Sequence, residues 1–319
     1  MNTQTIKNWH KKRKSLGVIN WNAIDLVVIT ISITALLSTF PLIGLLAIAG
    51  LFFVYPNQYN YMTKRKLQKA IREELVHPHY QARIGRDGKT ITGCEALARI
   101  SKRNEKETYL PSHFMETALN TGLITKIDQI VVRKALRDVH KWLRNGQIGS
   151  DFTVSFNVDR LNLVSKKNVL KLIQIIEQSG LPPSMIEMEI TEHSLEELSS
   201  RDTVLKNVQM IKDLTSIKLA IDDFSIGHSS AISLLTLPVD TIKIDKEFAS
   251  MTDEKALKFL SFLCTFGREI GCSMVFEGIE NLEQYRTFDS LGINIAEYQG
   301  YLFHRPTCTK GFEAFLLQA

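Results

Sequence analysis

Short apolar runs alternate with helix-like segments from residue 80 onward, and this alternation constrains the fold more than any other feature of the chain. Runs rich in β-branched and aromatic residues between turn signals are typical of strands, whereas longer segments with helical apolar spacing are typical of helices. The predicted strands cover residues 80–84, 91–97, 152–157, 186–192, 217–221, 239–244, 273–277 and 295–299. The predicted helices cover residues 111–119, 127–143, 169–178, 204–214, 256–270 and 282–291.

Asp87-Gly88, between the first two predicted strands, is a hairpin-type turn signal. The strands are mostly separated by helices at a spacing that indicates β-α-β units, in which the strands run parallel. A closed, TIM-like (β/α)8 barrel is the most economical α/β fold for about eight such strands. An open doubly wound sheet is the alternative, although the chain contains no GxGxxG sequence to support it.

A long apolar segment lies near the amino terminus. Residues 24–55 carry one charged residue, Asp25, and are too long a run for a soluble helix or a cleavable signal peptide, so they predict a membrane segment. Five Lys or Arg residues lie between residues 7 and 14, and five more between 64 and 72. Because cytoplasmic flanks are enriched in Lys and Arg, matched flanks favour a hairpin with both ends in the cytoplasm, with a single span as the alternative.

The expected organisation therefore has four parts. A basic cytoplasmic arm covers residues 1–20, the membrane segment 21–58, a basic linker 59–75, and a folded domain 76–319, with a break expected at His77-Pro78. The folded domain is predicted to lie on the cytoplasmic side of the membrane.

The basic residues of the chain are concentrated around the apolar segment. The net charge is +5, but residues 73–319 carry 29 Lys or Arg against 33 Asp or Glu, a net charge of −4. The local basicity is therefore no indication of DNA or RNA binding, which requires a basic face on the folded domain. The four cysteines form no CxxC pair, which suits a reduced compartment and gives no indication of zinc.

Two adjacent carboxylates, Asp222 and Asp223, follow the predicted strand 217–221. Alone they are also consistent with an ordinary Asp-rich turn, but other strands end in polar residues as well. These residues are Glu95, Asn157, Glu189, Lys243, Glu277 and Gln299. Strand ends converge on one face of a barrel, and carboxylate oxygens without His or Cys are the ligands of Mg²⁺ or Mn²⁺ rather than zinc.

The ordered motifs resemble those of the EAL family of cyclic di-GMP phosphodiesterases from about residue 80 to 317. They are Glu95-Ala96-Leu97-Ala98-Arg99, Asn157, Glu189-Ile190-Thr191-Glu192, Asp222-Asp223-Phe224, Lys243-Ile244-Asp245, Glu277-Gly278-Ile279-Glu280 and Gln299-Gly300. The resemblance implies a modified TIM barrel that hydrolyses cyclic di-GMP to linear pGpG with two divalent cations and forms a homodimer. The alternative is a weak or inactive EAL domain that senses cyclic di-GMP or binds a protein.

The resemblance also implies roles for individual residues. The implied metal ligands are Glu95, Asn157, Glu189, Asp222, Asp223 and Glu277. The implied catalytic residues are Lys243, Glu277, Gln299 and Asp223, and the implied substrate contacts are Gln81, Arg99 and Glu280. Glu192 corresponds to the residue that anchors the loop after Asp223.

Three positions depart from the family pattern. Ser225 stands where the family usually has glycine, Ala82 where proline is common, and Leu119 where glutamate is common. None of the three removes a proposed metal ligand.

Overall fold

The computed structural model describes residues 64–101, 108–191, 200–224, 234, 236–249, 253–290 and 296–318. The predicted arm, the membrane segment and residues 59–63 of the linker lie outside this range, as do Glu192 and Ser225. No helix in the described residues is both long and apolar enough to span a membrane. The chain forms two compact units, one of Val76–Arg99 with Ile124–Ala319 and one of Met1–Leu75 with Ile100–Leu123.

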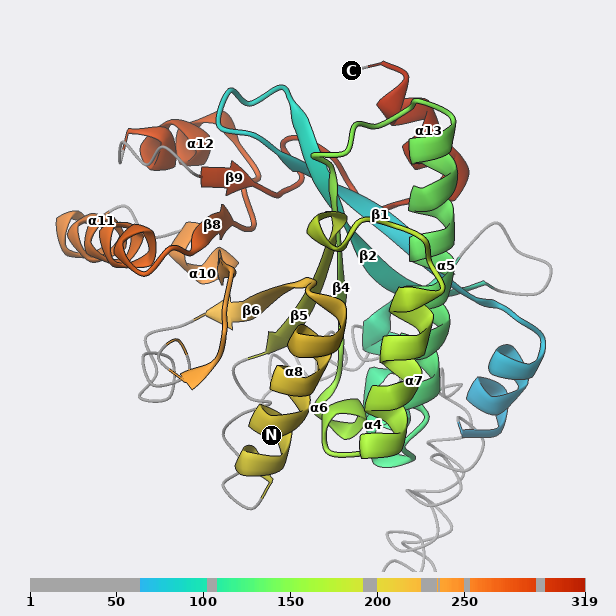
Figure 1. The fold of residues 1–319 in the computed structure, drawn as a ribbon. Helices are drawn as coiled ribbons and strands as arrows, with labels where there is room; N and C mark the ends of the chain where they lie inside the picture. Colours follow the sequence, from blue (N-terminus) through green and yellow to red (C-terminus); the bar gives the residue numbers. More distant parts are fainter. Residues whose placement is uncertain are drawn as a thin grey trace, which may run out of the picture. The chain divides into compact units, whose positions relative to one another are not determined.

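Eight strands of the first unit close into a barrel (Figure 1). They are β1 (Val76–Ile84), β2 (Ile91–Ser101), β4 (Thr153–Asn157), β5 (Ile186–Thr191), β6 (Lys218–Phe224), β7 (Thr241–Ile244), β8 (Ser273–Phe276) and β9 (Ala296–Tyr298). They are hydrogen-bonded in the order β1-β9-β8-β7-β6-β5-β4-β2, and a further pairing of β1 with β2 closes the ring. The predicted barrel is therefore confirmed.

The prediction that all strands run parallel is wrong at β1. This strand pairs antiparallel with β9, at Ile84 opposite Tyr298, and its outer part pairs antiparallel with β10 (Thr307–Cys308). The cause is the turn after β1, where Gly88 adopts a φ of +68° and the Gly85 amide donates to the carbonyl of Thr90. A turn this short returns the chain alongside itself, whereas a parallel neighbour needs a long crossover.

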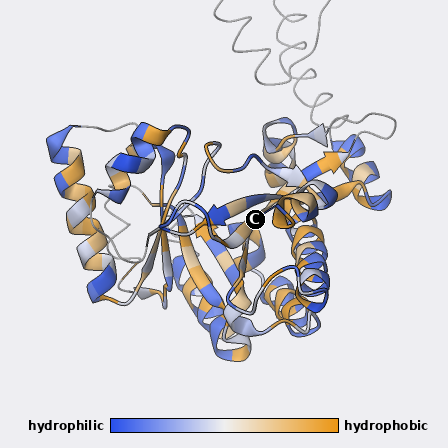
Figure 2. Cartoon of the chain, turned by 90° about the horizontal axis from the view of Figure 1, so that it is seen from above, coloured by the Kyte–Doolittle hydropathy of each residue, from blue (hydrophilic) through white to orange (hydrophobic). Residues whose placement is uncertain are grey.

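Helices cover the outside of the barrel. They are α5 (Ile124–Arg144), α6 (Arg160–Leu163), α7 (Lys166–Glu177), α8 (Arg201–Thr215), α10 (Lys246–Ala249), α11 (Glu254–Glu269), α12 (Leu282–Asp289) and α13 (Thr309–Leu316). Their apolar and polar residues lie on different sides, and the apolar residues face inward (Figure 2). The expected cap at Asn281 is confirmed, because its side chain accepts from the Gln284 amide in a complete capping box.

Aromatic side chains pack β1 against the helices α5 and α13 on one side of the barrel. Tyr80 of β1 packs against Trp142 of α5 with ring centroids 4.9 Å apart, and Trp142 packs against Phe312 of α13 at 5.3 Å. All three side chains are fully buried. The hydroxyl of Tyr80 donates to Asp138 at 2.9 Å, which satisfies the polar end of the ring.

A charged layer lies deep inside the barrel. Arg83 of β1 pairs with Glu187 of β5 and with Glu297 of β9, and the Thr241 hydroxyl donates to Glu187. Glu187 and Glu189 are two residues apart on one strand, so both side chains point to the same face. The layer around Glu187 therefore lies directly beneath the layer around Glu189.

The other unit is described by residues 64–75, Ile100–Ser101 and 108–123. Residues 64–72 are helical, and β3 (Thr108–Tyr109) pairs antiparallel with the end of β2 at Ile100. The helix predicted at 111–119 is divided into η1 (Pro111–His113) and α4 (Met115–Asn120). The division falls at Phe114, whose φ of −135° is not helical.

Candidate functional site

Seven strands direct polar side chains to one end of the barrel. β2 supplies Glu95, β4 Asn157, β5 Glu189, β6 Asp222 and β7 Lys243; Glu277 and Gln299 follow the last residues of β8 and β9. The strand register aligns them, with Asn157 opposite Glu189 and Thr191 opposite Asp222. The structure thus brings together the residues that the sequence placed at strand ends.

Lys243 lies at the centre of this group and is completely buried. Its Nζ atom is 2.8 Å from Glu189 Oε2, 2.8 Å from Glu277 Oε1, 2.9 Å from Asp222 Oδ1 and 3.5 Å from Glu95 Oε2. Burial alone would lower the pKa of Lys243, but the four carboxylates outweigh it and hold this pKa well above its usual value. The lysine is therefore a cation and a hydrogen-bond donor rather than a base.

Two amides orient Glu95. Asn157 Nδ2 donates to Glu95 Oε1 at 2.7 Å, and Gln299 Nε2 donates to Glu95 Oε2 at 2.6 Å. Burial opposes ionisation of Glu95, but Lys243 and these donors outweigh it and lower the pKa of this carboxyl. Glu95 is thus held as a carboxylate in a fixed orientation.

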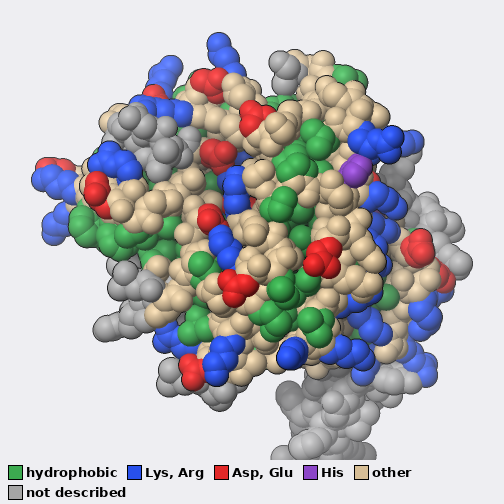
Figure 3. All heavy atoms as spheres, viewed as in Figure 1, with side chains coloured by type: hydrophobic (Ala, Val, Ile, Leu, Met, Phe, Trp, Pro, Cys, Tyr) green, Lys and Arg blue, Asp and Glu red, His purple; other side chains and the backbone are tan. Residues whose placement is uncertain are grey.

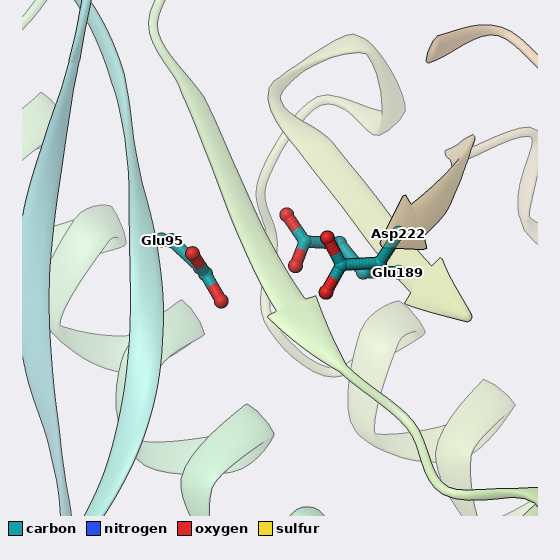
Figure 4. A group of neighbouring side chains, drawn as sticks. All are labelled: Glu95, Glu189 and Asp222. Carbon is teal, nitrogen blue, oxygen red and sulfur yellow. The ribbon is translucent and has the colours of Figure 1, made fainter. Parts of the chain in front are cut away.

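The carboxylates form two overlapping groups. Glu95, Glu189 and Asp222 each offer an oxygen within 4.8 Å of the others, and so do Asp222, Asp223 and Glu277. Figure 4 shows the first group, with the three carboxylates from separate strands turned toward one another. Asp222 belongs to both groups.

A bulge in β6 allows the carboxylates of Asp222 and Asp223 to lie in the same group. The pairing of β6 with β7 shifts register between Ile221 and Phe224, and Asp223 has a φ of +52°. Without the bulge, adjacent strand residues would point to opposite faces. The left-handed conformation costs roughly 1–2 kcal/mol for most residues, and Asp is among the few that adopt it routinely.

The negative charge of the group exceeds its positive charge. Five carboxylates (Glu95, Glu189, Asp222, Asp223 and Glu277) surround one ammonium group, a formal balance of −4. Burial and the neighbouring carboxylates raise the pKa of Glu189 well above its usual value. Burial, Asp222 and Glu95 raise the pKa of Glu277 to about 8 despite the attraction of Lys243.

Two buried oxygens in the group have no hydrogen-bond donor, Glu189 Oε1 and Gln299 Oε1, whereas Asp222 Oδ1 lies 2.9 Å from the Lys243 ammonium. Buried polar atoms are normally paired, so these oxygens need a donor or a cation. Two divalent cations would balance the formal charge and use the orphaned oxygens, so the residues present fit an oxygen-ligated Mg²⁺ or Mn²⁺ pair.

A pocket of about 260 Å³ opens onto these carboxylates. Gln81 and Glu280, two of the predicted substrate contacts, line it together with Glu95, Asp222 and Glu277. The third predicted contact, Arg99, is absent from this lining in the described residues; it is buried, and its Nη1 donates to the Ala98 carbonyl.

The pocket lining also includes Lys246 and Tyr301, which the sequence reasoning missed. Both follow closely on a predicted motif, Lys246 after Lys243-Ile244-Asp245 and Tyr301 after Gln299-Gly300. Their closeness to strand ends was the signal that could have identified them.

Two glycines make this edge of the pocket possible. A Cβ on Gly278, whose φ is +67°, would lie 2.2 Å from Lys246 Cβ, and one on Gly300 would lie 2.0 Å from the Ile279 carbonyl oxygen. The loop after β8 lies so close to α10 at Gly278, and the loop after β9 so close to the loop after β8 at Gly300, that only glycine fits at either position.

Residues 64–306 match the sequence family described as EAL domain. The chain belongs to the EAL domain family. This EAL domain is 31% identical over 230 residues to the cyclic di-GMP phosphodiesterase RocR of Pseudomonas aeruginosa, covering 72% of this chain and 56% of RocR. It is 28% identical over 255 residues to the signaling protein YkoW of Bacillus subtilis, covering 79% of this chain and 31% of YkoW. The match thus spans about a third to a half of the length of these relatives.

The same fold is found in the solved structure of the phosphodiesterase MucR of Pseudomonas aeruginosa in complex with cyclic di-GMP. The two superpose with a TM-score of 0.70 at 26% identity, covering 79% of this chain and 99% of the other. The EAL domain here therefore has the barrel seen in that complex.

Proposed function

We propose that this chain is a metal-dependent phosphodiesterase that hydrolyses cyclic di-GMP to linear pGpG. The observation that carries the proposal is the surplus of carboxylates around Lys243, with buried oxygens that have no donor. RocR and MucR, which share this family, carry the name cyclic di-GMP phosphodiesterase. The observation and the names support the same activity.

In the proposed arrangement, Glu95, Asn157, Glu189 and Asp222 hold one divalent cation, and Asp222, Asp223 and Glu277 hold the second. Divalent cations in such a site supply positive charge to a phosphodiester and lower the pKa of water. For Asn157, its oxygen is the ligand atom, because its Nδ2 donates to Glu95. Gln299, which also donates to Glu95, fixes that carboxylate in place.

The protein groups then direct the attack of water on phosphorus. Lys243, held as a cation, donates a hydrogen bond to the attacking water, and Glu277 or Asp223 accepts the proton that this water loses. The water oxygen forms a new bond to phosphorus, the bond from phosphorus to the 3′ oxygen breaks, and the 3′ oxygen takes up a proton. One water is consumed, and the product is pGpG. Gln81 and Glu280 at the pocket mouth contact the nucleotide.

The test uses the full chain in detergent, incubated with cyclic di-GMP and either Mg²⁺ or Mn²⁺. We expect pGpG on anion-exchange chromatography, no product with EDTA, and recovery when the cation is restored. Absence of pGpG at saturating Mg²⁺ and Mn²⁺ would overturn the proposal. Tight binding of cyclic di-GMP without turnover would instead support the sensing alternative.

We further propose that the enzyme is anchored in a bacterial inner membrane through residues 21–58, with the EAL domain in the cytoplasm and paired with a second copy. The support is the apolar run at 24–55 with matched basic flanks. Reporter fusions at residues 2 and 70 should lie on the same side of the membrane. Opposite sides would rule out the hairpin.

A further inference from the structure

A second cavity lies away from the acidic pocket, along α5 and the end of α7. It is a groove of about 760 Å³, within the range of small-molecule sites. Leu136 and Ile175, both buried, form its apolar floor, and Gln178 and Ser179 add polar groups after α7. None of the residues that line the pocket over Glu95 and Asp222 takes part in it.

The groove is strongly basic. Its lining contains Arg133, Arg137, Lys141 and Arg144 of α5, as well as His140, and no Asp or Glu. The four long cations follow each other at helical spacing, so they share one side of the helix. Basic side chains gather over the region of α5 and α7 in Figure 3, although residues 73–319 carry a net charge of −4.

The acids of α5 do not compensate this charge at the surface. The helix has two, Asp128 and Asp138, and both are buried. Asp128 accepts from the Asp159 amide, and Asp138 accepts from Tyr80. Every exposed charged side chain of α5 is therefore a cation.

Two of the cations have no acidic partner. Lys141 pairs with Glu313 at 2.8 Å and Arg137 with Asp138 at 3.5 Å, but Arg133 and Arg144 form no ion pair within the described part of the chain. They are eleven residues apart, which corresponds to about 16 Å along a helix. The groove therefore has a guanidinium group available toward each end, and guanidinium groups match phosphate oxygens in shape and charge.

His140 is fixed between them. Its Nδ1 lies 2.6 Å from the Ser179 carbonyl oxygen, which can only accept, so Nδ1 carries a hydrogen and donates. Gly180 then turns with a φ of +69°, and a Cβ there would lie 3.0 Å from the His140 ring. This contact joins α5 to the end of α7 and keeps the groove preformed.

We propose that this groove is a second ligand site, which binds a small molecule that carries two or more phosphate groups. The carriers with this chemistry are a free polyphosphate or nucleoside polyphosphate and the headgroup of an anionic phospholipid. The site is separate from the hydrolytic pocket, and the proposal does not depend on the proposed function.

The experiment titrates the full chain in detergent by calorimetry, with EDTA present so that no cation links phosphate to the acidic pocket. The probes are inorganic tripolyphosphate and a soluble short-chain phosphatidylglycerol. The test variant is Arg133→Gln/Arg144→Gln. The control is Lys255→Gln/Lys258→Gln on α11, which removes the same charge from exposed side chains elsewhere.

We expect saturable binding of tripolyphosphate that weakens at high salt and falls about tenfold or more in the test variant, because two charge-assisted contacts are lost. The control should stay within about twofold of the wild type. If the wild type binds phosphatidylglycerol but not tripolyphosphate, and the test variant loses this binding, the site is supported and its ligand is a lipid headgroup. No binding of either probe, or equal loss in the control, would overturn the proposal.

Hydrolysis of cyclic di-GMP with Mg²⁺ provides an independent check on the test variant. Without added phosphate ligand its rate should stay within about twofold of the wild type, because neither arginine touches the acidic pocket. A variant that has lost both hydrolysis and binding is misfolded; the milder single change Arg144→Gln then replaces it. If the wild type does not hydrolyse cyclic di-GMP, the proposed phosphodiesterase function fails. The titration in EDTA still tests the phosphate site, because it does not depend on hydrolysis.

Discussion

Two buried cations, Arg83 and Lys243, lie one layer apart in the barrel, and they differ in how many carboxylates surround them. Arg83 is paired with Glu187 and Glu297, and Glu187 also accepts from Thr241. Lys243 is surrounded by four carboxylates, and Oε1 of Glu189 has no donor. A buried ion pair therefore does not by itself indicate a functional site in this barrel. The surplus of carboxylate oxygens around Lys243 does indicate one.

The two layers also differ in their pKa shifts. Burial would raise the pKa of Glu187, but Arg83 and Thr241 outweigh it and lower this pKa. In the upper layer, which is the one around Lys243 and Glu189, burial and neighbouring carboxylates raise the pKa of Glu189 and Glu277. In the lower layer, which is the one around Arg83 and Glu187, the carboxylates are thus stabilised by groups of the protein. The carboxylates of the upper layer need added protons or cations.

The largest effect is expected on activity in the upper layer. Glu95→Gln removes a proposed metal ligand at nearly constant volume and should reduce hydrolysis of cyclic di-GMP by about a thousandfold or more. Its stability in EDTA should fall, because Lys243 and two amide donors stabilise the Glu95 carboxylate in the folded state. Turnover within a few-fold of the wild type would refute the assignment of Glu95 as a ligand.

The next largest effect is expected on stability in the lower layer. Glu187→Gln leaves Arg83 with one carboxylate partner and should cost about 3 kcal/mol of unfolding free energy, the lower end for breaking a buried pair. Urea unfolding monitored by circular dichroism measures this cost. Activity below the melting temperature should remain within about tenfold of the wild type. A dead but fully stable Glu187→Gln protein would show that the two layers are not functionally distinct.

An effect of comparable size is expected from pH in the cation-free protein. The folded-state pKa of Glu277 is about 8, above the value of about 4.3 for unfolded Glu, so the folded state holds the extra proton. Its contribution to stability is present at low pH and lost as pH rises toward 8, with a slope of about 1.4 kcal/mol per pH unit for each proton. Urea unfolding in EDTA at pH 5, 6.5 and 8 should show this decline. Glu277→Gln should reduce the slope, and an unchanged slope would remove Glu277 as its cause.

The smallest effect is expected from Thr241→Val. The change keeps the shape of the side chain but removes the hydroxyl that donates to Glu187, and it should cost about 1 kcal/mol. Activity should not change. The measurement is the shift in the urea midpoint, and the matched control is Thr287→Val, whose exposed hydroxyl bonds only within its own helix. Equal losses in the two variants would mean that the deep layer gains nothing from this bond.

Much of the barrel and its site could be predicted from the sequence. Strands that end in Glu189, Asp222 or Lys243 combine an apolar run with a polar end, and parallel topology brings such ends together. The Asp87-Gly88 turn indicated a hairpin after the first strand, but the general expectation of parallel strands did not take it into account. The start of β1 at Val76 was missed because residues 77–78 were expected to break the connector helix that precedes the domain, yet Pro78 lies within β1.

Other features could not be predicted because they depend on distances between remote residues. The pairing of Arg83 with Glu187 joins residues 104 positions apart, and neither lies in a recognisable motif. The basic groove depends on the burial of Asp128 and Asp138, which in the sequence appear to neutralise α5. Sequence patterns report composition along an element, whereas exposure is decided by what packs against it.

The presence of Asp222 in both carboxylate groups has a consequence for how the site fails. Glu95 and Glu189 serve one group and Asp223 and Glu277 the other, so a change at any of these impairs one position and leaves its neighbour intact. Asp222 offers no such redundancy. A change at Asp222 is expected to impair both positions at once, and the bulge that turns Asp223 beside it allows one short strand to serve both.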